Sequence, residues 1–189
     1  AAEALLAREI DLTMVELADR ILSTIFDPTG SRLAETILRR EGVDVKTGTT
    51  VTEIMGRGGR VDHAVLRDGE RIDADLILVA IGVRLNTALV PADAGIEVGR
   101  GIRVDAHMRT TAPDVYAAGD CVEAYDALTE SYRQIAIWPL AYRQGHIAGR
   151  NMIGEPRAYE GGFPMNSIGV CDVPTISVGS VDPPDDGER

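Results

Sequence analysis

The segment TTAPDVYAAGD, residues 110–120, limits what this chain can fold into more than any other stretch. Pro113 fixes its own φ and pushes the preceding residue toward an extended backbone, so the segment begins as a loop. Val115 and Tyr116 favour a short buried strand. Small residues follow that let a ligand approach the backbone, and Asp120 ends the run as a pure hydrogen-bond acceptor when ionised. A strand that ends in a small turn and one carboxylate is suited to bind the hydroxyls of a polyol or a ribose.

The composition of the whole chain excludes several classes of protein. Its 189 residues allow one large or two small domains, and its 30 acidic and 19 basic residues give a net charge of −11. Such a charge argues against a nucleic-acid or anionic-membrane surface. The longest apolar run, Leu76–Val83, is far shorter than the roughly 20 residues of a membrane span, and no signal peptide is visible. The two cysteines form no C-x-x-C or zinc spacing, so a reduced, cytoplasmic protein is expected.

The order of apolar segments in the first half of the chain predicts an α/β fold. Residues 12–15 are a short apolar strand, residues 31–41 have the apolar periodicity of a helix, and residues 43–46 are a second, parallel strand. From Thr50 the pattern changes to three short antiparallel strands separated by glycine turns. Residues 75–82 form a continuous apolar run, which is typical of a central parallel strand.

The second half predicts further short elements around residues 110–120. A strand is expected at residues 101–105, a polar surface loop at 126–131, and a helix at 142–152 with Pro139 at or near its first turn. Two more strands are expected at residues 163–170 and 175–178. The three histidines are isolated in sequence, and no cluster of metal-ligating residues is apparent.

Residues 110–120 resemble the second flavin-binding motif of the FAD-dependent pyridine nucleotide–disulfide oxidoreductases. That motif reads T-x-x-P-x-[hydrophobic]-[aromatic]-A-x-G-D, and its defining positions are occupied here by Thr110, Pro113, Val115, Tyr116, Ala117, Gly119 and Asp120. The resemblance implies that Asp120 accepts a hydrogen bond from the ribitol chain of FAD, next to Gly119. Within the family, the chain looks closest to the branch of NADH oxidases, CoA-disulfide reductases and nitrite reductases.

The resemblance also implies a domain organisation. Residues 1–85 are expected to be a Rossmann-like, three-layer NAD-binding domain with a parallel sheet and a small antiparallel meander. Residues 86–155 would be the C-terminal part of the FAD-binding domain, and residues 156–189 the start of an α+β interface domain through which relatives dimerise. In the family, the Gly-rich phosphate-binding loop stands immediately before the helix with which this chain begins. The sequence is therefore expected to be a piece of a longer polypeptide.

Three residues are candidates for binding NAD. Glu16 follows a short strand, where a carboxylate in a βαβ unit accepts from the 2′-hydroxyl of the NAD ribose. A 2′-phosphate would meet a like charge there, which favours NADH over NADPH, although Arg20 nearby keeps an NADPH-dependent reading open. The resemblance implies that Ile81 and Gly82 lie against the nicotinamide nucleotide; Gly82 could otherwise simply end a strand.

Pro139 and Leu140 are the remaining candidates for binding FAD. In relatives the N-terminus of this helix points at the pyrimidine edge of the flavin, where the helix dipole stabilises the negative charge of the reduced ring. The alternative is that Trp138 and Leu140 are core residues and that Pro139 only starts the helix.

The resemblance implies an oxidoreductase that passes a hydride from NADH to FAD and then electrons to a small molecule or a small redox protein. A homo-oligomer is expected. No catalytic residue or metal ligand is assigned in this chain, because the redox cysteines of the family come from an N-terminal half that is absent here. The chain by itself is expected to bind little FAD and to be inactive. Two alternatives remain: a non-catalytic nucleotide-binding or interaction module of the same fold, and an NADPH-dependent enzyme related to glutathione reductase.

Overall fold

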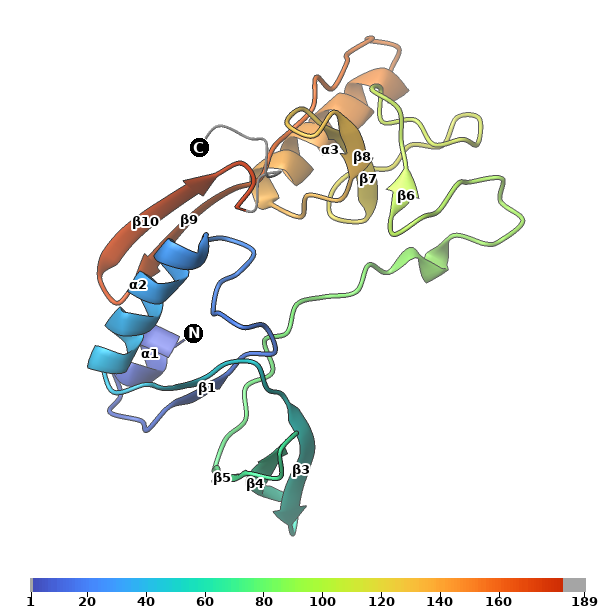
Figure 1. Ribbon diagram of the computed structural model, residues 1–189. Helices are drawn as coiled ribbons and strands as arrows, with labels where there is room; N and C mark the ends of the chain where they lie inside the picture. Colours follow the sequence, from blue (N-terminus) through green and yellow to red (C-terminus); the bar gives the residue numbers. More distant parts are fainter. Residues whose placement is uncertain (1, 182–189) are drawn as a thin grey trace. The chain divides into compact units, whose positions relative to one another are not determined.

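The computed structural model describes residues 2–181, and their contacts divide the chain into two compact units. Unit 1 comprises residues 1–81 together with 166–189, and unit 2 comprises Gly82–Met165. Figure 1 shows the helices and strands along the chain. The grouping of contacts does not test the three functional domains expected from the sequence, which stay a prediction.

Unit 1 contains the predicted parallel strand pair and its helix. After α1 (Ala2–Leu6), β1 (Thr13–Val15) pairs in parallel with β2 (Asp44–Lys46), and α2 (Pro28–Arg40) connects them. Asp27 is the N-cap of α2, because its carboxylate accepts a 2.7 Å hydrogen bond from the Gly30 amide, and Pro28 occupies the first turn.

The predicted antiparallel meander is also present in unit 1. It consists of β3 (Val51–Arg57), β4 (Arg60–Leu66) and β5 (Arg71–Asp73), in that spatial order. The mixture of parallel and antiparallel sheets with helices confirms the predicted α/β class.

The core of unit 1 joins the two ends of the described chain. An antiparallel hairpin of β9 (Met165–Val170) and β10 (Val173–Val178) turns at Cys171 and Asp172. Val170 belongs to the same buried cluster as residues of α2, of β2 and of the loops beside them: Ile21, Ala34, Leu38, Val43 and Val45. Burial of these apolar side chains holds the hairpin in unit 1.

Unit 2 is built around a small sheet and one long helix. After the 3₁₀ turn η1 (Thr87–Leu89), β6 (Ile102–Arg103) pairs in parallel with β7 (Val122–Asp126), which pairs antiparallel with β8 (Ser131–Arg133). The helix α3 (Trp138–Met152) starts four residues earlier than predicted, with Pro139 in its first turn. Its inner face packs into a buried cluster of Ile102, Val104, Met108, Val122, Ala124, Ile147, Ala148 and Tyr159.

One prediction is wrong, and a second needs a correction at a single residue. Residues 76–80 form no strand in the structure, and Leu76, Val79 and Ile81 are 70%, 65% and 92% exposed. A continuous apolar run becomes a central strand only when strands pair on both sides of it. No strand among residues 2–181 pairs with residues 76–80. The surface loop expected at residues 126–131 is exposed from residue 127 onward, but its first residue, Asp126, ends β7 and is fully buried.

Asp126 is buried because its carboxylate is compensated on two sides. It accepts hydrogen bonds from the Leu128 amide, at 2.8 Å, and from the Arg133 guanidinium. Burial by itself raises the pKa of this carboxyl, but these two partners outweigh burial and hold the pKa below its usual value. The pair therefore stabilises the connection between β7 and β8.

Candidate functional site

The segment that carries the flavin-like motif folds into a tight loop in unit 2. The Thr110 amide donates to the carbonyl of Val115 at 2.9 Å, which closes the loop around Pro113. Tyr116 then forms an isolated bridge with Arg109, in place of the short strand expected from its sequence. The Ala117 amide donates to the carbonyl of Met108 at 3.1 Å, and Met108 is fully buried. The loop is thus fastened to the core of unit 2.

Gly119 and Asp120 lie at the end of this loop. Gly119 has φ of +90°, a left-handed conformation that glycine adopts without strain. Its amide donates a 2.8 Å hydrogen bond to Oε1 of Gln144 on α3. Asp120 is exposed, and its backbone carbonyl accepts from Nε2 of Gln134 at 3.0 Å. The backbone at this point is held from two sides, and no described hydrogen bond involves the carboxylate of Asp120.

The structure brings the loop next to the beginning of α3. A Cβ added at Gly119 would lie 3.7 Å from the Cβ of Ala141, in the first turn of the helix. The N-cap residue of α3 is Ile137, whose side chain cannot accept a hydrogen bond from the helix amides. Pro139 is exposed and Leu140 is half-buried. The four residues assigned to FAD therefore lie in one unit, at one place.

These residues fit the ribitol chain and ring edge of a flavin. An exposed carboxylate, a glycine without a side chain and the uncapped positive end of a helix offer an acceptor, room and a favourable potential for negative charge. The fit concerns only these parts of FAD. The binding roles of the four residues stay predictions.

Glu16 directly follows β1 in unit 1, as the sequence predicted. Its amide donates to the carbonyl of Lys46 at 2.8 Å, and its Oε1 accepts from the Ala18 amide at 2.8 Å. The side chain is half-buried, and its hydrogen bond with the Ala18 amide stabilises the backbone that follows β1. Arg20 forms a 3.3 Å ion pair with Asp19, so its guanidinium already faces a carboxylate.

Ile81 and Gly82 lie in the exposed apolar segment. Ile81 is 92% exposed, and Gly82 has φ of +86°. Glu16 instead forms its hydrogen bonds with Ala18, Lys46 and Thr49. Glu16 and Ile81 belong to unit 1 and Gly82 to unit 2, and their roles at one NAD site stay predictions.

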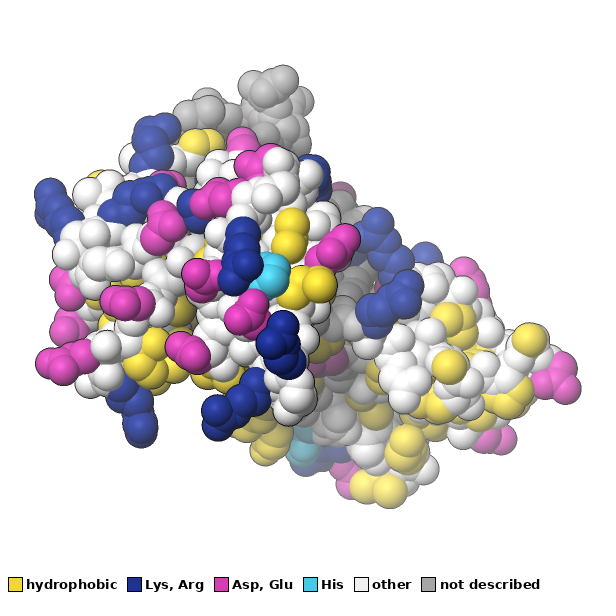
Figure 2. Space-filling model, turned by 90° about the horizontal axis from the view of Figure 1, so that it is seen from below, with side chains coloured by type: hydrophobic (Ala, Val, Ile, Leu, Met, Phe, Trp, Pro, Cys, Tyr) yellow, Lys and Arg dark blue, Asp and Glu magenta, His cyan; other side chains and the backbone are white. Residues whose placement is uncertain are grey.

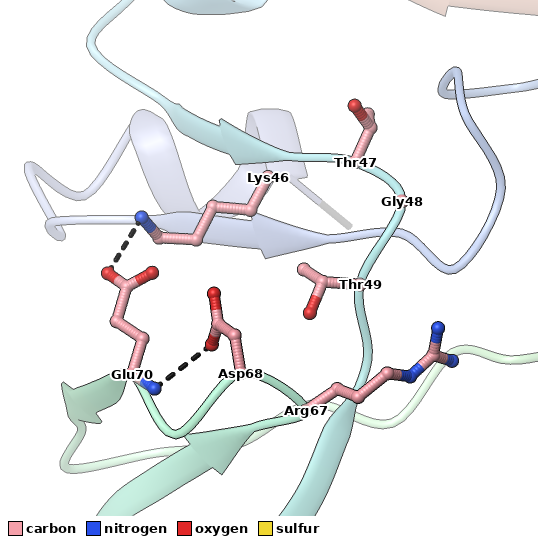
Figure 3. Close-up of a pocket in the computed structure, with 7 residues that line it drawn as sticks. All are labelled: Lys46, Thr47, Gly48, Thr49, Arg67, Asp68 and Glu70. Carbon is pink, nitrogen blue, oxygen red and sulfur yellow. Dashed lines mark hydrogen bonds and ion pairs between the residues drawn. The ribbon is translucent and has the colours of Figure 1, made fainter.

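A hollow of about 620 Å³ lies in unit 1, and two of its lining residues, Lys46 and Thr49, form backbone hydrogen bonds with Glu16. Figure 3 shows its lining residues at the end of β2 and at the turn between β4 and β5: Lys46, Thr47, Gly48, Thr49, Arg67, Asp68 and Glu70. Nζ of Lys46 lies 2.9 Å from Glu70 and 3.3 Å from Asp44, and these hydrogen bonds raise the pKa of the lysine above its usual value. Because Lys46 has two carboxylate partners, the hollow offers no unpaired lysine to an anion.

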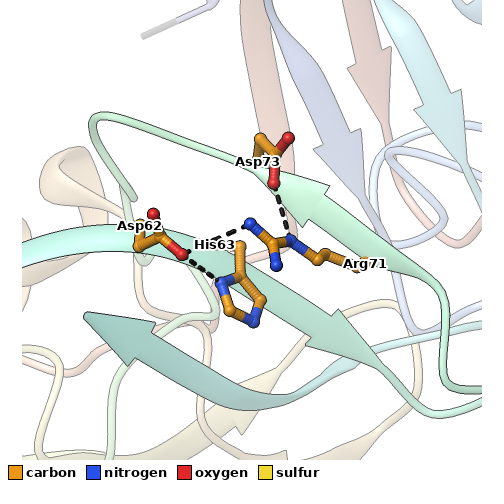
Figure 4. Close-up of polar contacts among 4 residues, drawn as sticks. All are labelled: Asp62, His63, Arg71 and Asp73. Carbon is orange, nitrogen blue, oxygen red and sulfur yellow. Dashed lines mark hydrogen bonds and ion pairs between the residues drawn. The ribbon is translucent and has the colours of Figure 1, made fainter. Parts of the chain in front are cut away.

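A second group of charged side chains occupies the meander. In Figure 4, Asp62 of β4 lies between two partners: Nδ1 of His63 at 2.7 Å and the guanidinium of Arg71 at 3.3 Å. The hydrogen bond with His63 is the main reason why the pKa of Asp62 lies below its usual value. The group contains no nucleophile, and residues 2–181 hold no cluster of three histidine, cysteine or acidic side chains suited to a metal ion.

The surface of the protein carries side chains of both charges (Figure 2). On the face drawn in Figure 2, acidic and basic side chains are interspersed and form no broad basic patch. Within residues 2–181, every helix is too short or too polar to cross a membrane.

Comparison with known proteins identifies the family. A sequence model described as pyridine nucleotide-disulphide oxidoreductase matches residues 1–145. This chain therefore belongs to the pyridine nucleotide-disulphide oxidoreductase family, as the residues of its motif predicted.

Individual relatives agree with this assignment. The chain is 32% identical over 179 residues to an NADH oxidase of Methanocaldococcus jannaschii, covering 94% of this chain and 39% of that protein. It is 34% identical over 143 residues to a rubredoxin-NAD(+) reductase of Pseudomonas putida, covering 76% and 37%. The structure of a water-forming NADH oxidase from Lactobacillus brevis bound to NADH matches with a TM-score of 0.87 at 25% identity, over 95% of this chain and 39% of that one. The chain thus spans less than half the length of these relatives.

One residue that the sequence analysis missed contacts the loop directly. Gln144 is 4% exposed and lies on the same face of α3 as Ile147, Ala148 and Asn151. A polar residue at an apolar position of a helix is a signal for a buried hydrogen bond. The spacing of positions 144, 147, 148 and 151 could have revealed it.

Proposed function

We propose that this chain is part of a flavoprotein oxidoreductase that passes a hydride from NADH to FAD and then electrons to an acceptor. The observation that carries the proposal is the position of Gly119 and Asp120 beside the first turn of α3, in a chain that belongs to this family. Bound FAD would supply the hydride-accepting chemistry, while the protein binds and orients it.

Within unit 2, each residue has a distinct part in this proposal. The carboxylate of Asp120 accepts a hydrogen bond from a ribitol hydroxyl, and Gly119 leaves room for that chain. Pro139 and Leu140 bring the peptide dipoles of the first turn of α3 to the pyrimidine edge of the flavin. These dipoles stabilise the negative charge that the ring gains on reduction.

In unit 1, Glu16 selects the nucleotide. Its Oε1 is occupied by the Ala18 amide, and its second oxygen accepts from the 2′-hydroxyl of the NAD ribose. A 2′-phosphate would be repelled there, and the ion pair of Arg20 with Asp19 opposes the NADPH-dependent alternative. The roles of Ile81 and Gly82 at the nicotinamide rest on the family resemblance alone.

The electron acceptor would be oxygen, a disulfide, nitrite or a small redox protein. Relatives include a reductase named for rubredoxin, which supports the last class. We place the enzyme in the cytoplasm as a homo-oligomer, an assignment that rests on the cysteine content and on the family resemblance.

The experiment uses the full-length polypeptide that contains this chain, purified with FAD and mixed anaerobically with NADH or NADPH. We expect bleaching of the flavin absorbance, faster with NADH. The variant Asp120→Ala should bind FAD about ten to a hundred times more weakly, since a hydrogen bond to a charged group contributes about 1.5–3 kcal/mol. Asp93→Ala removes another exposed carboxylate of unit 2 and should leave FAD affinity unchanged.

Each other outcome has a defined meaning. An unmodified protein that binds FAD but is not reduced by NADH would be a non-catalytic module. Faster reduction by NADPH would overturn the role of Glu16. Equal FAD affinity of Asp120→Ala and the unmodified protein would overturn the role of Asp120.

A further inference from the structure

Gln144 is the only described side chain that joins the Gly119 backbone to α3, and it does so from a buried position. Its Oε1 accepts from the Gly119 amide at 2.8 Å, and its Nε2 donates to the hydroxyl of Tyr159 at 3.5 Å. Because an amide donor must face the carboxamide oxygen, the Gly119 contact fixes the orientation of the carboxamide. The nitrogen is then directed to Tyr159.

Tyr159 is held independently of Gln144. It is 3% exposed, its amide donates to the carbonyl of Ala106 at 2.6 Å, and the guanidinium of Arg143 lies 5.4 Å from its ring centroid. Its hydroxyl packs against Gly162, because a Cβ added at that residue would lie 2.4 Å from the hydroxyl oxygen. Tyr159 therefore provides a fixed point against which the carboxamide of Gln144 is oriented.

The contact matters because Gly119 cannot be positioned by side-chain packing. It has no Cβ, and its φ of +90° is a conformation that other residues rarely adopt, so hydrogen bonds to its two peptides hold it in place. The hydrogen bond that the Gly119 amide donates to Gln144 restrains the peptide between Ala118 and Gly119, and the Val122 amide holds the next peptide by donating to the Gly119 carbonyl at 3.2 Å. Loss of this acceptor would leave the Gly119 amide without a protein partner.

We propose that Gln144 is a positioning residue that sets where the Asp120 carboxylate stands relative to the first turn of α3. This inference rests on the proposed function for its consequence, the binding of FAD. It adds a residue outside the motif, 24 positions after Asp120, that acts through the backbone and touches no ligand itself.

The test compares two buried amides on the same face of one helix. Gln144→Met keeps the length of the side chain but removes the acceptor for the Gly119 amide. Asn151→Leu removes a comparable buried network at the other end of α3, where Asn151 donates to the carbonyls of His107 and Arg157 at 3.1 and 2.8 Å. Asn151→Leu therefore controls for a general loss of stability in unit 2. Gln144→Glu keeps an acceptor for Gly119 and serves as the conservative rescue.

The first readout needs no cofactor: amide hydrogen exchange of Gly119 in this chain, measured by NMR. We expect exchange at Gly119 to become about tenfold faster in Gln144→Met than in Asn151→Leu, and to be restored in Gln144→Glu. Equal exchange at Gly119 in the unmodified chain and Gln144→Met overturns the positioning role, whatever the function of the protein.

The second readout is FAD affinity in the full-length polypeptide. We expect Gln144→Met to bind FAD about tenfold more weakly than Asn151→Leu does, with Gln144→Glu close to the unmodified protein. Equal losses in Gln144→Met and Asn151→Leu would reduce Gln144 to a stabilising residue. If the unmodified protein binds no FAD, the proposed function fails, and the Gly119 exchange result still decides the structural claim.

Discussion

The loop at residues 110–120 and the apolar run at residues 75–82 have opposite environments, although the sequence predicts a strand beside a cofactor in both. The loop is fastened by backbone hydrogen bonds at Thr110, Ala117 and Gly119 and rests on a buried core. Within residues 2–181, the backbone of residues 75–86 makes no described hydrogen bond, and most of its side chains are exposed. A motif built from turn-forming and hydrogen-bonding residues specifies its own local structure. An apolar run specifies only that other elements must cover it.

Hydrogen exchange of the two regions should show the largest difference. We expect the amides of Ile77 and Val79 to exchange at nearly the rate of an unstructured peptide, because they have no hydrogen-bond partner here. The amides of Val122 and Ala124 in β7 should exchange about a thousandfold more slowly than those of Ile77 and Val79, because they become exposed only when much of unit 2 unfolds. Comparable protection of Ile77 in NMR exchange spectra would show that the run is paired in solution, in this chain or with another copy.

A matched pair of valine substitutions should sharpen the comparison through stability. Val122 is 2% exposed and Val83 is 82% exposed, and both lie in unit 2. Val122→Ala should lower the free energy of unfolding by about 2 kcal/mol, because buried methyl groups are lost and a cavity remains. Val83→Ala should change it by less than about 0.5 kcal/mol.

Urea unfolding followed by the fluorescence of Trp138, the single tryptophan of the chain, measures both variants in unit 2. A cost for Val83→Ala that equals the cost for Val122→Ala would mean that the run is covered after all. The contrast between the two regions would then be wrong.

The smallest expected effect concerns the buried carboxylate of Asp126, at the connection between β7 and β8. The pKa of Asp126 lies below its ordinary value, so its ionised form stabilises unit 2 above pH of about 4, and this contribution is lost as the pH falls through the lowered pKa. Asp126→Asn should therefore lower stability by about 1.5 kcal/mol at pH 7 and by progressively less in acid. Urea midpoints at pH 7, 5, 4 and 3 measure this convergence. A constant difference across these pH values would show that Asp126 is not ionised in the folded protein.

Much of the fold could be predicted because local residue types determine it. The parallel pair β1 and β2, the meander from Thr50 and the helix after Pro139 follow from periodicity, glycine turns and the fixed φ of proline. The proximity of Gly119 to the start of α3 followed from the family resemblance, and the structure shows it.

Other features depend on contacts that a sequence pattern does not contain. The buried state of Asp126 depends on Arg133, seven residues away, and the role of Gln144 depends on Gly119, 25 residues away. Residues 76–80 illustrate the opposite case: their composition is that of a central strand, but the neighbouring strands that it requires are not among the described residues.

The hairpin of β9 and β10 has a consequence for biosynthesis. Cys171 donates its amide to Glu3, across a sequence separation of 168 residues, and Val170 completes the cluster around α2. On a translating ribosome, all residues of unit 2 emerge before the hairpin of β9 and β10 that completes unit 1. Residues 1–81 therefore keep part of their apolar surface uncovered during synthesis, while unit 2 can already fold. Chaperone binding to nascent chains would be expected to concentrate on those early residues.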